Sequence, residues 1–174
     1  MSLVFSKITD QDREFLYRVF RSTRLDELTP LGWTAEQITA FLMMQFNAQH
    51  TYYQNTFPDA SYQIVWLDGQ PIGRLYLERR NDGLHIIDIA LLPEFRNRGI
   101  GSLLLQDIIR QGEAQGIPVQ IYVEQYNPAL RLYHRLGFRQ IGYTGVYFLM
   151  ERVPGPLTET TQPASDSSGA MAGL

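Results

Sequence analysis

The stretch from residue 89 to residue 109 constrains the fold most, because it joins an apolar strand to a helix with an apolar face through a short basic loop. Gly116 followed by Pro118 predicts the end of this helix, since glycine favours the left-handed position after a helix and proline cannot continue one. A short apolar strand, 119–123, comes next. Parallel strands require a crossover of this kind, so the sequence predicts a parallel pair here.

The beginning of the same helix is a candidate anion site. A helix N-terminus leaves backbone N–H groups unpaired and carries partial positive charge. Gly99 and Gly101 let that backbone approach an anion closely, and Arg96 and Arg98 add full charges beside it. An ordinary strand-to-helix connection with solvated arginines fits the same residues. A Walker loop does not fit, because no Gly-Lys-Ser/Thr ending is present, and Leu104 replaces the third glycine of a dinucleotide loop.

Hydrophobic periodicity predicts two helices in the N-terminal third of the chain. Thr9 and Thr34 each precede a helical pattern in the position of an N-cap, and the first pattern ends near Ser22. We expect a mixed loop over 22–33 and an irregular aromatic loop over 50–59. Rings in such a loop either cover the core or line a pocket.

Strands are predicted where the hydrophobic period changes to two. Asp68-Gly69 indicates a two-residue hairpin, and Asn81-Asp82-Gly83 indicates a second turn. Further along, Asn127 caps a short helix with Pro128 at its first position, and Gly137 ends it. The expected strands are 3–8, 62–67, 72–78, 84–91, 119–123, 138–144 and 146–152.

Composition excludes several classes of function. The net charge of −3 argues against nucleic acid as the main partner. The lack of cysteine removes disulfides, thiolate metal sites and a cysteine nucleophile, and the three histidines show no close pairing that would hold a metal. The N-terminus does not resemble a signal peptide, and no apolar run approaches the roughly 20 residues that span a bilayer. We therefore expect a soluble cytoplasmic protein without a metal or a membrane partner.

The length of 174 residues suits one domain. After Pro154 the composition shifts to proline, glycine, serine and threonine without an aromatic residue. We expect a folded domain over 1–153 and a flexible tail over 154–174.

Two motifs, in this order, resemble those of the GNAT superfamily of CoA-dependent N-acetyltransferases. The run 96–101, Arg-Asn-Arg-Gly-Ile-Gly, is similar to the family's pyrophosphate loop, Arg/Gln-x-x-Gly-x-Gly/Ala. Further on, Asn127, Leu130, Tyr133 and the pair Gly137-Phe138 stand at the spacing of the family's fourth conserved region. Two motifs in the right order and context are far more specific than either alone.

The resemblance covers about residues 3 to 152 and implies a fold. The expected class is α+β, a three-layer arrangement of helices on both faces of a mixed, mostly antiparallel sheet of about seven strands. Two central parallel strands would splay apart to admit acetyl-CoA.

The resemblance also implies the cofactor contacts. Main-chain groups of Ile89, Ala90 and Leu91 would pair with the pantetheine amides, and Asn127 would touch the pantetheine arm. Tyr133 would reach the sulfur. The pyrophosphate would be bound by the loop Arg96, Asn97, Arg98, Gly99, Ile100, Gly101 and Ser102.

Acetyl transfer to an amine poses two proton problems. An alkyl ammonium, with a pKa near 10.4, must lose a proton before it attacks, and the departing thiolate must gain one or be stabilised. The resemblance implies that Tyr133 solves the second problem, by donating to the departing thiolate. Core packing is the alternative role for any tyrosine on an amphipathic helix. Asp88 and Glu124 are the acids nearest the expected splay. Either is a candidate base acting through water, and either could instead hold an arginine or a loop amide.

We therefore expect an acetyl-CoA-dependent N-acetyltransferase that moves an acetyl group directly to a primary amine in a ternary complex. The acceptor is a small molecule or a protein amino group, and a homodimer stays open. The alternative is a non-catalytic acyl-CoA-binding sensor or scaffold. The acceptor pocket is expected to involve 25–33, 52–57 and 143–147, whose aromatic character favours an amine with an apolar body.

Overall fold

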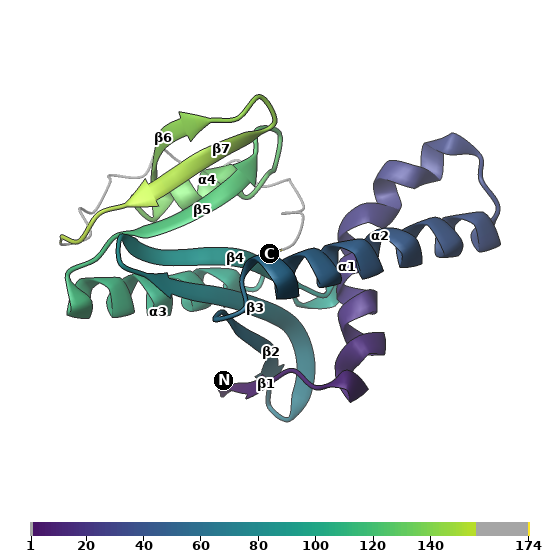
Figure 1. Ribbon diagram of the computed structural model, residues 1–174, viewed down its shortest axis with the longest axis horizontal. Helices are drawn as coiled ribbons and strands as arrows, with labels where there is room; N and C mark the ends of the chain where they lie inside the picture. Colours follow the sequence, from purple (N-terminus) through teal and green to yellow (C-terminus); the bar gives the residue numbers. More distant parts are fainter. Residues whose placement is uncertain (1, 156–173) are drawn as a thin grey trace. The chain divides into compact units, whose positions relative to one another are not determined.

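The computed structural model describes residues 2–155 and Leu174 (Figure 1). The described chain forms two compact units. The first comprises residues 2–76 and 88–94, and the second comprises 77–87, 95–155 and Leu174. The tail predicted over 154–174 falls almost entirely outside the described residues.

The described residues form a seven-stranded sheet of order β1-β2-β3-β4-β5-β7-β6. Strands β4 and β5 are parallel, and β5 pairs with β7 in the antiparallel sense, so the predicted mixed sheet is confirmed. The strands are β1 Leu3–Lys7, β2 Ser61–Leu67, β3 Gln70–Arg80, β4 Gly83–Leu91, β5 Val119–Glu124, β6 Arg139–Tyr143 and β7 Tyr147–Arg152. The helices are α1 Arg13–Leu28, α2 Ala35–Thr56, α3 Ile100–Gln115 and α4 Leu130–Arg135, with short 3₁₀ turns at Asp10–Asp12, Thr29–Leu31 and Pro93–Phe95.

Local signals in the first unit act as the sequence predicts. The Thr34 hydroxyl accepts a hydrogen bond from the backbone N–H of Gln37 at 3.1 Å, and the Gln37 side chain accepts one from the backbone of Thr34 at 2.9 Å. This reciprocal capping box begins α2. Asp68 and Gly69 have φ values of 48° and 83°, the pair of positive angles that a two-residue hairpin needs.

Two loop predictions in this unit are wrong. The loop expected over 22–33 is helical as far as Leu28, and the loop expected over 50–59 is helical as far as Thr56. No proline stands in the first segment before Pro30, so nothing in it breaks the helix. In the second, tertiary contacts override the weak helix propensity of the tyrosines: the Tyr62 hydroxyl of β2 donates to the Tyr53 and Phe57 carbonyls, each at 2.8 Å.

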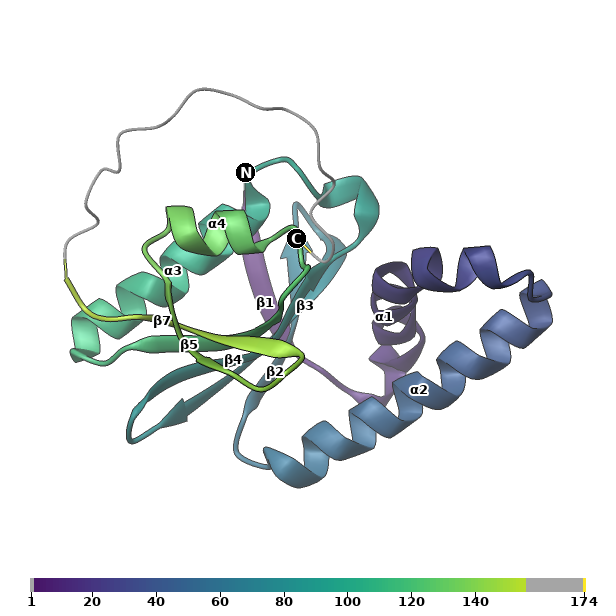
Figure 2. The ribbon, with the colours of Figure 1, turned by 90° about the horizontal axis from the view of Figure 1, so that it is seen from above.

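The second unit packs α3 against β5. A Cβ added to Gly112 of α3 would stand 3.0 Å from the Val119 side chain and 2.8 Å from the Ile117 carbonyl, so only glycine allows this approach. Helix α3 ends as predicted at Gly116, which has a φ of 66°. Figure 2 shows α3 and α4 on the same side of β5 and β7. The parallel register joins Leu84–Ile86 to Val119–Ile121, and both strands continue beyond it.

A buried arginine ties the end of β7 to two helices. The Arg152 Nε donates to the Leu136 carbonyl at the end of α4 at 3.0 Å, and its Nη1 donates to Glu113 of α3 at 2.8 Å. Its Nη2 donates to the Gly155 carbonyl at 3.0 Å. A positive charge at a helix C-terminus is favourable, so this side chain fixes the short helix α4.

Replacing Arg152 by methionine should lower the free energy of unfolding by about 2 kcal/mol, because the buried Leu136 carbonyl and the partly buried Gly155 carbonyl lose their donor while Glu113 stays partly solvated. Urea unfolding measures the change. Arg139→Met, at an exposed arginine of β6, is the matched control and should have little effect. Equal stability of the two variants would contradict this role.

Candidate active site

Helix α3 begins at a left-handed glycine. Gly99 has φ 78° and ψ 2°, and the backbone N–H of Leu103 donates to its carbonyl at 3.1 Å. The amides of Ile100, Gly101 and Ser102 come before the first residue that can bond within the helix. A Cβ at Gly99 would meet nothing within 4 Å, so the space beside this turn is open among the described residues. The turn therefore fits a bound diphosphate.

Arg96 and Arg98 come just before this turn in the sequence. The guanidinium of exposed Arg98 lies 5.4 Å from the ring centroid of Phe95, a cation–π arrangement that orients it. Asn97, in the same loop, has a φ of 60°, a conformation that asparagine tolerates better than most residues. Leu174 packs on the first turn of α3: its side chain comes within 3.3 Å of a Cβ built at Gly101. An anion bound here would share the surface with Leu174.

Tyr133 lies on α4 and is buried, with 3% of its surface exposed. Its ring meets Phe138 edge to face, with the centroids 5.5 Å apart, and the Phe138 N–H donates to the Tyr133 carbonyl at 3.0 Å. Helix α4 begins at Leu130, two residues later than predicted, and the Asn127 carboxamide accepts from the Ala129 N–H at 2.9 Å. The second motif therefore folds into a tight turn that sets the start of the tyrosine's helix.

Glu124 ends β5 and is partly exposed. Its carbonyl accepts from the Asn127 N–H at 2.9 Å, and it stands opposite Tyr147 in the register of β5 and β7. The carboxylate candidate and the second motif are therefore joined by one short turn.

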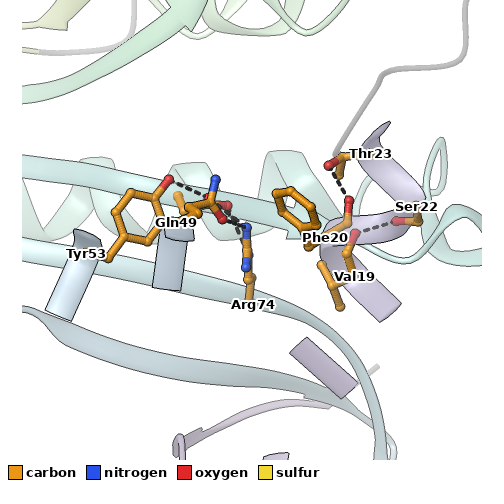
Figure 3. A network of polar contacts seen from close by, with 8 residues as sticks. Val19, Phe20, Ser22, Thr23, Gln49, Tyr53 and Arg74 are labelled. Carbon is orange, nitrogen blue, oxygen red and sulfur yellow. Dashed lines mark hydrogen bonds and ion pairs between the residues drawn. The ribbon is translucent and has the colours of Figure 1, made fainter. Parts of the chain in front are cut away.

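Asp88 of β4 has a different environment, at the centre of a buried polar network. Arg74 of β3 donates from Nε and Nη2 to its two carboxylate oxygens, at 3.2 and 2.9 Å. The Tyr53 hydroxyl of α2 donates to it at 2.9 Å, and Arg74 Nη2 also donates to the side-chain oxygen Oε1 of Gln49 at 3.1 Å. Figure 3 shows Gln49, Tyr53 and Arg74 converging. Arg74 is only 3% exposed, so this fork-like pair compensates a buried charge.

The network favours the neutral form of its tyrosines. Burial, and then the negative charge of Asp88, raise the pKa of Tyr53 well above its ordinary value. Burial raises the pKa of Tyr76 to about 12, although the Arg74 charge opposes the shift. The Arg74 guanidinium lies 5.1 Å from the centroid of the Tyr76 ring, and the buried Tyr76 hydroxyl has no hydrogen-bond partner among the described residues.

Sequence reasoning missed Arg74 and Tyr53. The sequence does contain a signal for Arg74: an arginine inside the apolar run 72–77 needs an anionic partner if the strand is buried. Nothing in the sequence indicated that the partner would be Asp88, and the alternative that this residue holds an arginine is the one that the geometry matches.

The proposed pantetheine contacts, Ile89, Ala90 and Leu91, form the buried end of β4. The backbone of β3 lies close beside them: a Cβ at Gly73 would stand 2.2 Å from the Ala90 carbonyl oxygen. The Leu92 N–H donates to the Ile72 carbonyl at 2.8 Å. Glycine at position 73 is therefore required for this segment of β4 to keep its place.

The sequence model of the Acetyltransferase (GNAT) family matches residues 25–138. The chain belongs to this family. Over 67 residues it is 31% identical to an N-alpha-acetyltransferase of Sulfurisphaera tokodaii, a match that spans 37% of this chain and 40% of that relative.

Solved GNAT structures share the fold. The PaiA N-acetyltransferase of Thermoplasma acidophilum, in complex with coenzyme A, superposes with a TM-score of 0.65 at 21% identity, covering 88% of this chain and 99% of that one. An acetyltransferase of Thermus thermophilus gives a TM-score of 0.61 at 18% identity, covering 88% and 97%. Among the described residues of this GNAT chain, no group of three or more acidic or histidine side chains could hold a metal ion, and no helix is long and apolar enough to cross a membrane.

The unpaired hydroxyl of Tyr76 generates a stability prediction. Tyr76→Phe should stabilise the protein at pH 7 by about 1 kcal/mol, because it removes a buried polar group without a partner. The wild type should lose stability as the pH rises from about 10 to 12, because the folded pKa of Tyr76, about 12, lies above the unfolded 10.0.

The Tyr76→Phe variant should lose less stability than the wild type between about pH 10 and 12. The loss that remains comes from the raised pKa of Tyr53. Urea unfolding at pH 7 and between pH 9.5 and 11 measures both effects, and Tyr126→Phe, at a tyrosine that is 87% exposed, is the control. A destabilised Tyr76→Phe variant with the wild-type pH dependence would refute this description of the hydroxyl.

Proposed function

We propose that this GNAT chain is an acetyl-CoA-dependent N-acetyltransferase that moves the acetyl group directly to a primary amine in a ternary complex. The observation that carries the proposal is the start of α3, where a left-handed glycine leaves three amides beside open space and the charged Arg98 directly precedes it. The matched region of the GNAT family includes this turn and Tyr133.

The roles of the cofactor-binding residues follow from their chemistry. The amides of Ile100, Gly101 and Ser102 bind the pyrophosphate oxygens, with charge from Arg96 and Arg98. The backbone of Ile89–Leu91 pairs with the pantetheine amides, and Asn127 contacts the pantetheine arm. The positioning of a thioester against an amine is the main contribution that such contacts make to rate.

Two side chains handle the protons. Glu124, through a water molecule, takes a proton from the acceptor ammonium, and the freed amine nitrogen bonds to the acetyl carbon. The nitrogen then gives its second proton to water as the carbon–sulfur bond breaks, which leaves the neutral amide. The Tyr133 hydroxyl donates to the departing sulfur and is reprotonated from solvent. We assign the base to Glu124 rather than to Asp88, because Arg74 and Tyr53 occupy both oxygens of Asp88. Asp88 then serves as the residue that positions the end of β4.

The acceptor is a primary amine of a small molecule or of a protein. The name of the Sulfurisphaera relative supports a protein α-amine, and the exposed tyrosines of β5 and β7 support an amine with an apolar body.

Arg98→Glu should weaken CoA binding about tenfold or more, because it reverses a charge beside the diphosphate. Isothermal titration with CoA measures the affinity. Arg110→Glu makes the same change at an exposed position of α3, eight residues beyond Ser102, and is the matched control. Equal affinities in the two variants would remove the loop from the binding site.

Tyr133→Phe should lower kcat by about 10²–10⁴ while CoA affinity stays the same, because the phenol acts only on the leaving group. Thiol release from acetyl-CoA with a panel of amines measures turnover. Unchanged turnover would show that the hydroxyl has no such role.

The burial of Tyr133 against Phe138 also suits a packing residue, which favours the sensor or scaffold as the second candidate. Tight CoA binding without acceptor-dependent thiol release from the wild type would select that candidate.

A further inference from the structure

Helix α2 sends two polar side chains to the neighbouring strands from one face. Gln49 and Tyr53 stand four residues apart, a spacing that places both on the same side of a helix. The Tyr53 hydroxyl donates to Asp88 of β4 at 2.9 Å, and the Gln49 side chain accepts from Arg74 of β3 at 3.1 Å (Figure 3). All four residues belong to the first compact unit, so polar contacts join α2 to β3 and β4 within that unit.

The contact between Tyr53 and Asp88 is a strong one. Its acceptor is a carboxylate whose side chain is 15% exposed, and hydrogen bonds to charged groups are worth more than neutral ones. Burial, and then the charge of Asp88, raise the pKa of Tyr53, so the phenol keeps its proton over the neutral range. The Tyr53 ring also meets the Tyr76 ring edge to face, with the centroids 5.9 Å apart. Tyr53 is therefore held as a lasting donor to Asp88.

Asp88 directly precedes Ile89–Leu91, the segment of β4 that is proposed to pair with the pantetheine amides. The parallel ladder with β5 covers Leu84–Ile86, so this segment lies beyond it. Strand β3 approaches the segment closely at Gly73, where an added Cβ would stand 2.2 Å from the Ala90 carbonyl oxygen. The position of this backbone therefore depends on β3 and on the anchor that the Asp88 side chain provides.

We infer that Tyr53 is a positioning residue for the cofactor: through Asp88 it holds Ile89–Leu91 in the place where the pantetheine arm binds, and it ties this segment to α2. Hydrogen bonds to a ligand need donor–acceptor distances of about 2.9 Å, so a small shift of this backbone weakens them. Without the hydroxyl, Asp88 keeps its bonds to Arg74 but loses its link to α2, and the end of β4 has to be ordered when the cofactor binds. The inference rests on the proposed function, since it concerns the same cofactor site.

Tyr53→Phe tests this role with two ligands that differ only in the pantetheine arm. CoA carries the arm, and 3′-phosphoadenosine 5′-diphosphate is the part of CoA that remains without it. Isothermal titration of the full-length variant should give a Kd for CoA that is about 3- to 30-fold higher than in the wild type. The Kd of the diphosphate should stay the same, because that ligand contacts the start of α3 and does not reach β4. Unchanged CoA affinity, or an equal loss for both ligands, would overturn the inference.

Two further variants separate a positioning role from a general loss of structure. Tyr52→Phe removes the hydroxyl of the adjacent tyrosine, which is 58% exposed, and should leave the Kd of CoA unchanged. Gln49→Met removes the other contact from α2, which acts on Asp88 through Arg74, and should weaken CoA binding by a smaller factor than Tyr53→Phe. Equal effects of Tyr52→Phe and Tyr53→Phe would overturn the inference. If Tyr53→Phe does not fold, Gln49→Met decides with the same two ligands, and unchanged CoA affinity would then overturn it.

NMR spectra of the free protein report the position of the segment itself. The backbone amides of Ile89–Leu91 should shift in Tyr53→Phe and keep their wild-type positions in Tyr52→Phe, while the amides of 100–102 stay in place in both variants. Shifted β4 amides together with unchanged CoA affinity would show that the contact is structural alone, and would overturn the positioning role.

Acetyl transfer, measured as thiol release with a panel of amines, distinguishes this inference from the proposed function. In Tyr53→Phe the KM for acetyl-CoA should rise while kcat stays within about twofold, because the bound cofactor itself restores the position of the segment. Tyr53-dependent CoA binding in a wild type that releases no thiol would contradict the acetyltransferase function and leave the positioning role standing. Thiol release by the wild type, with the same KM in Tyr53→Phe, would contradict the positioning role and leave the function standing.

Discussion

The left-handed conformation of Gly99 is the constraint on which the proposed chemistry depends. Gly99 turns the chain into α3 with a φ of 78°, and it has no side chain that would cover the first amides of the helix. The space beside these amides is open among the described residues. A residue with a Cβ costs about 1–2 kcal/mol in this conformation. The adjacent charge of Arg98 adds to the field of the helix terminus. The proposed anion site therefore depends on backbone geometry first and on side chains second.

Buried arginines hold the surrounding elements in place. Arg74 joins α2 to β3 and β4 within the first unit, and Arg152 joins β7 to α3 and α4 within the second. Each charge is tolerated because hydrogen bonds and a carboxylate compensate it. The first of these clusters commits Asp88 to a structural partner, which is why the proposed mechanism assigns proton transfer to Glu124 instead.

The predictable part of the fold is the part that local sequence controls. The Asp68-Gly69 turn, the Thr34 capping box and the end of α3 at Gly116 follow from conformational preferences within a few residues. The parallel pair of β4 and β5 follows from the crossover helix. The lengths of α1 and α2 could not be predicted in this way, because the last turns of α2 depend on contacts with Tyr62, which lies outside the helix.

In the candidate site, too, the features set by local sequence could be predicted and those set by tertiary contacts could not. The start of α3 was visible in the glycines and arginines of one short run. The partners of Asp88 were not, because Tyr53 and Arg74 are 35 and 14 residues away in sequence and only the tertiary fold brings them together. The roles of Tyr133 and Glu124 rest on chemistry and on family membership, and they stay proposals.

Backbone amide shifts during a CoA titration test the central claim most directly. In ¹H–¹⁵N NMR spectra, the account predicts that the largest downfield proton shifts fall on the amides of Ile100, Gly101 and Ser102, since these donate to the pyrophosphate. Saturable CoA binding that leaves these three resonances in place would contradict it.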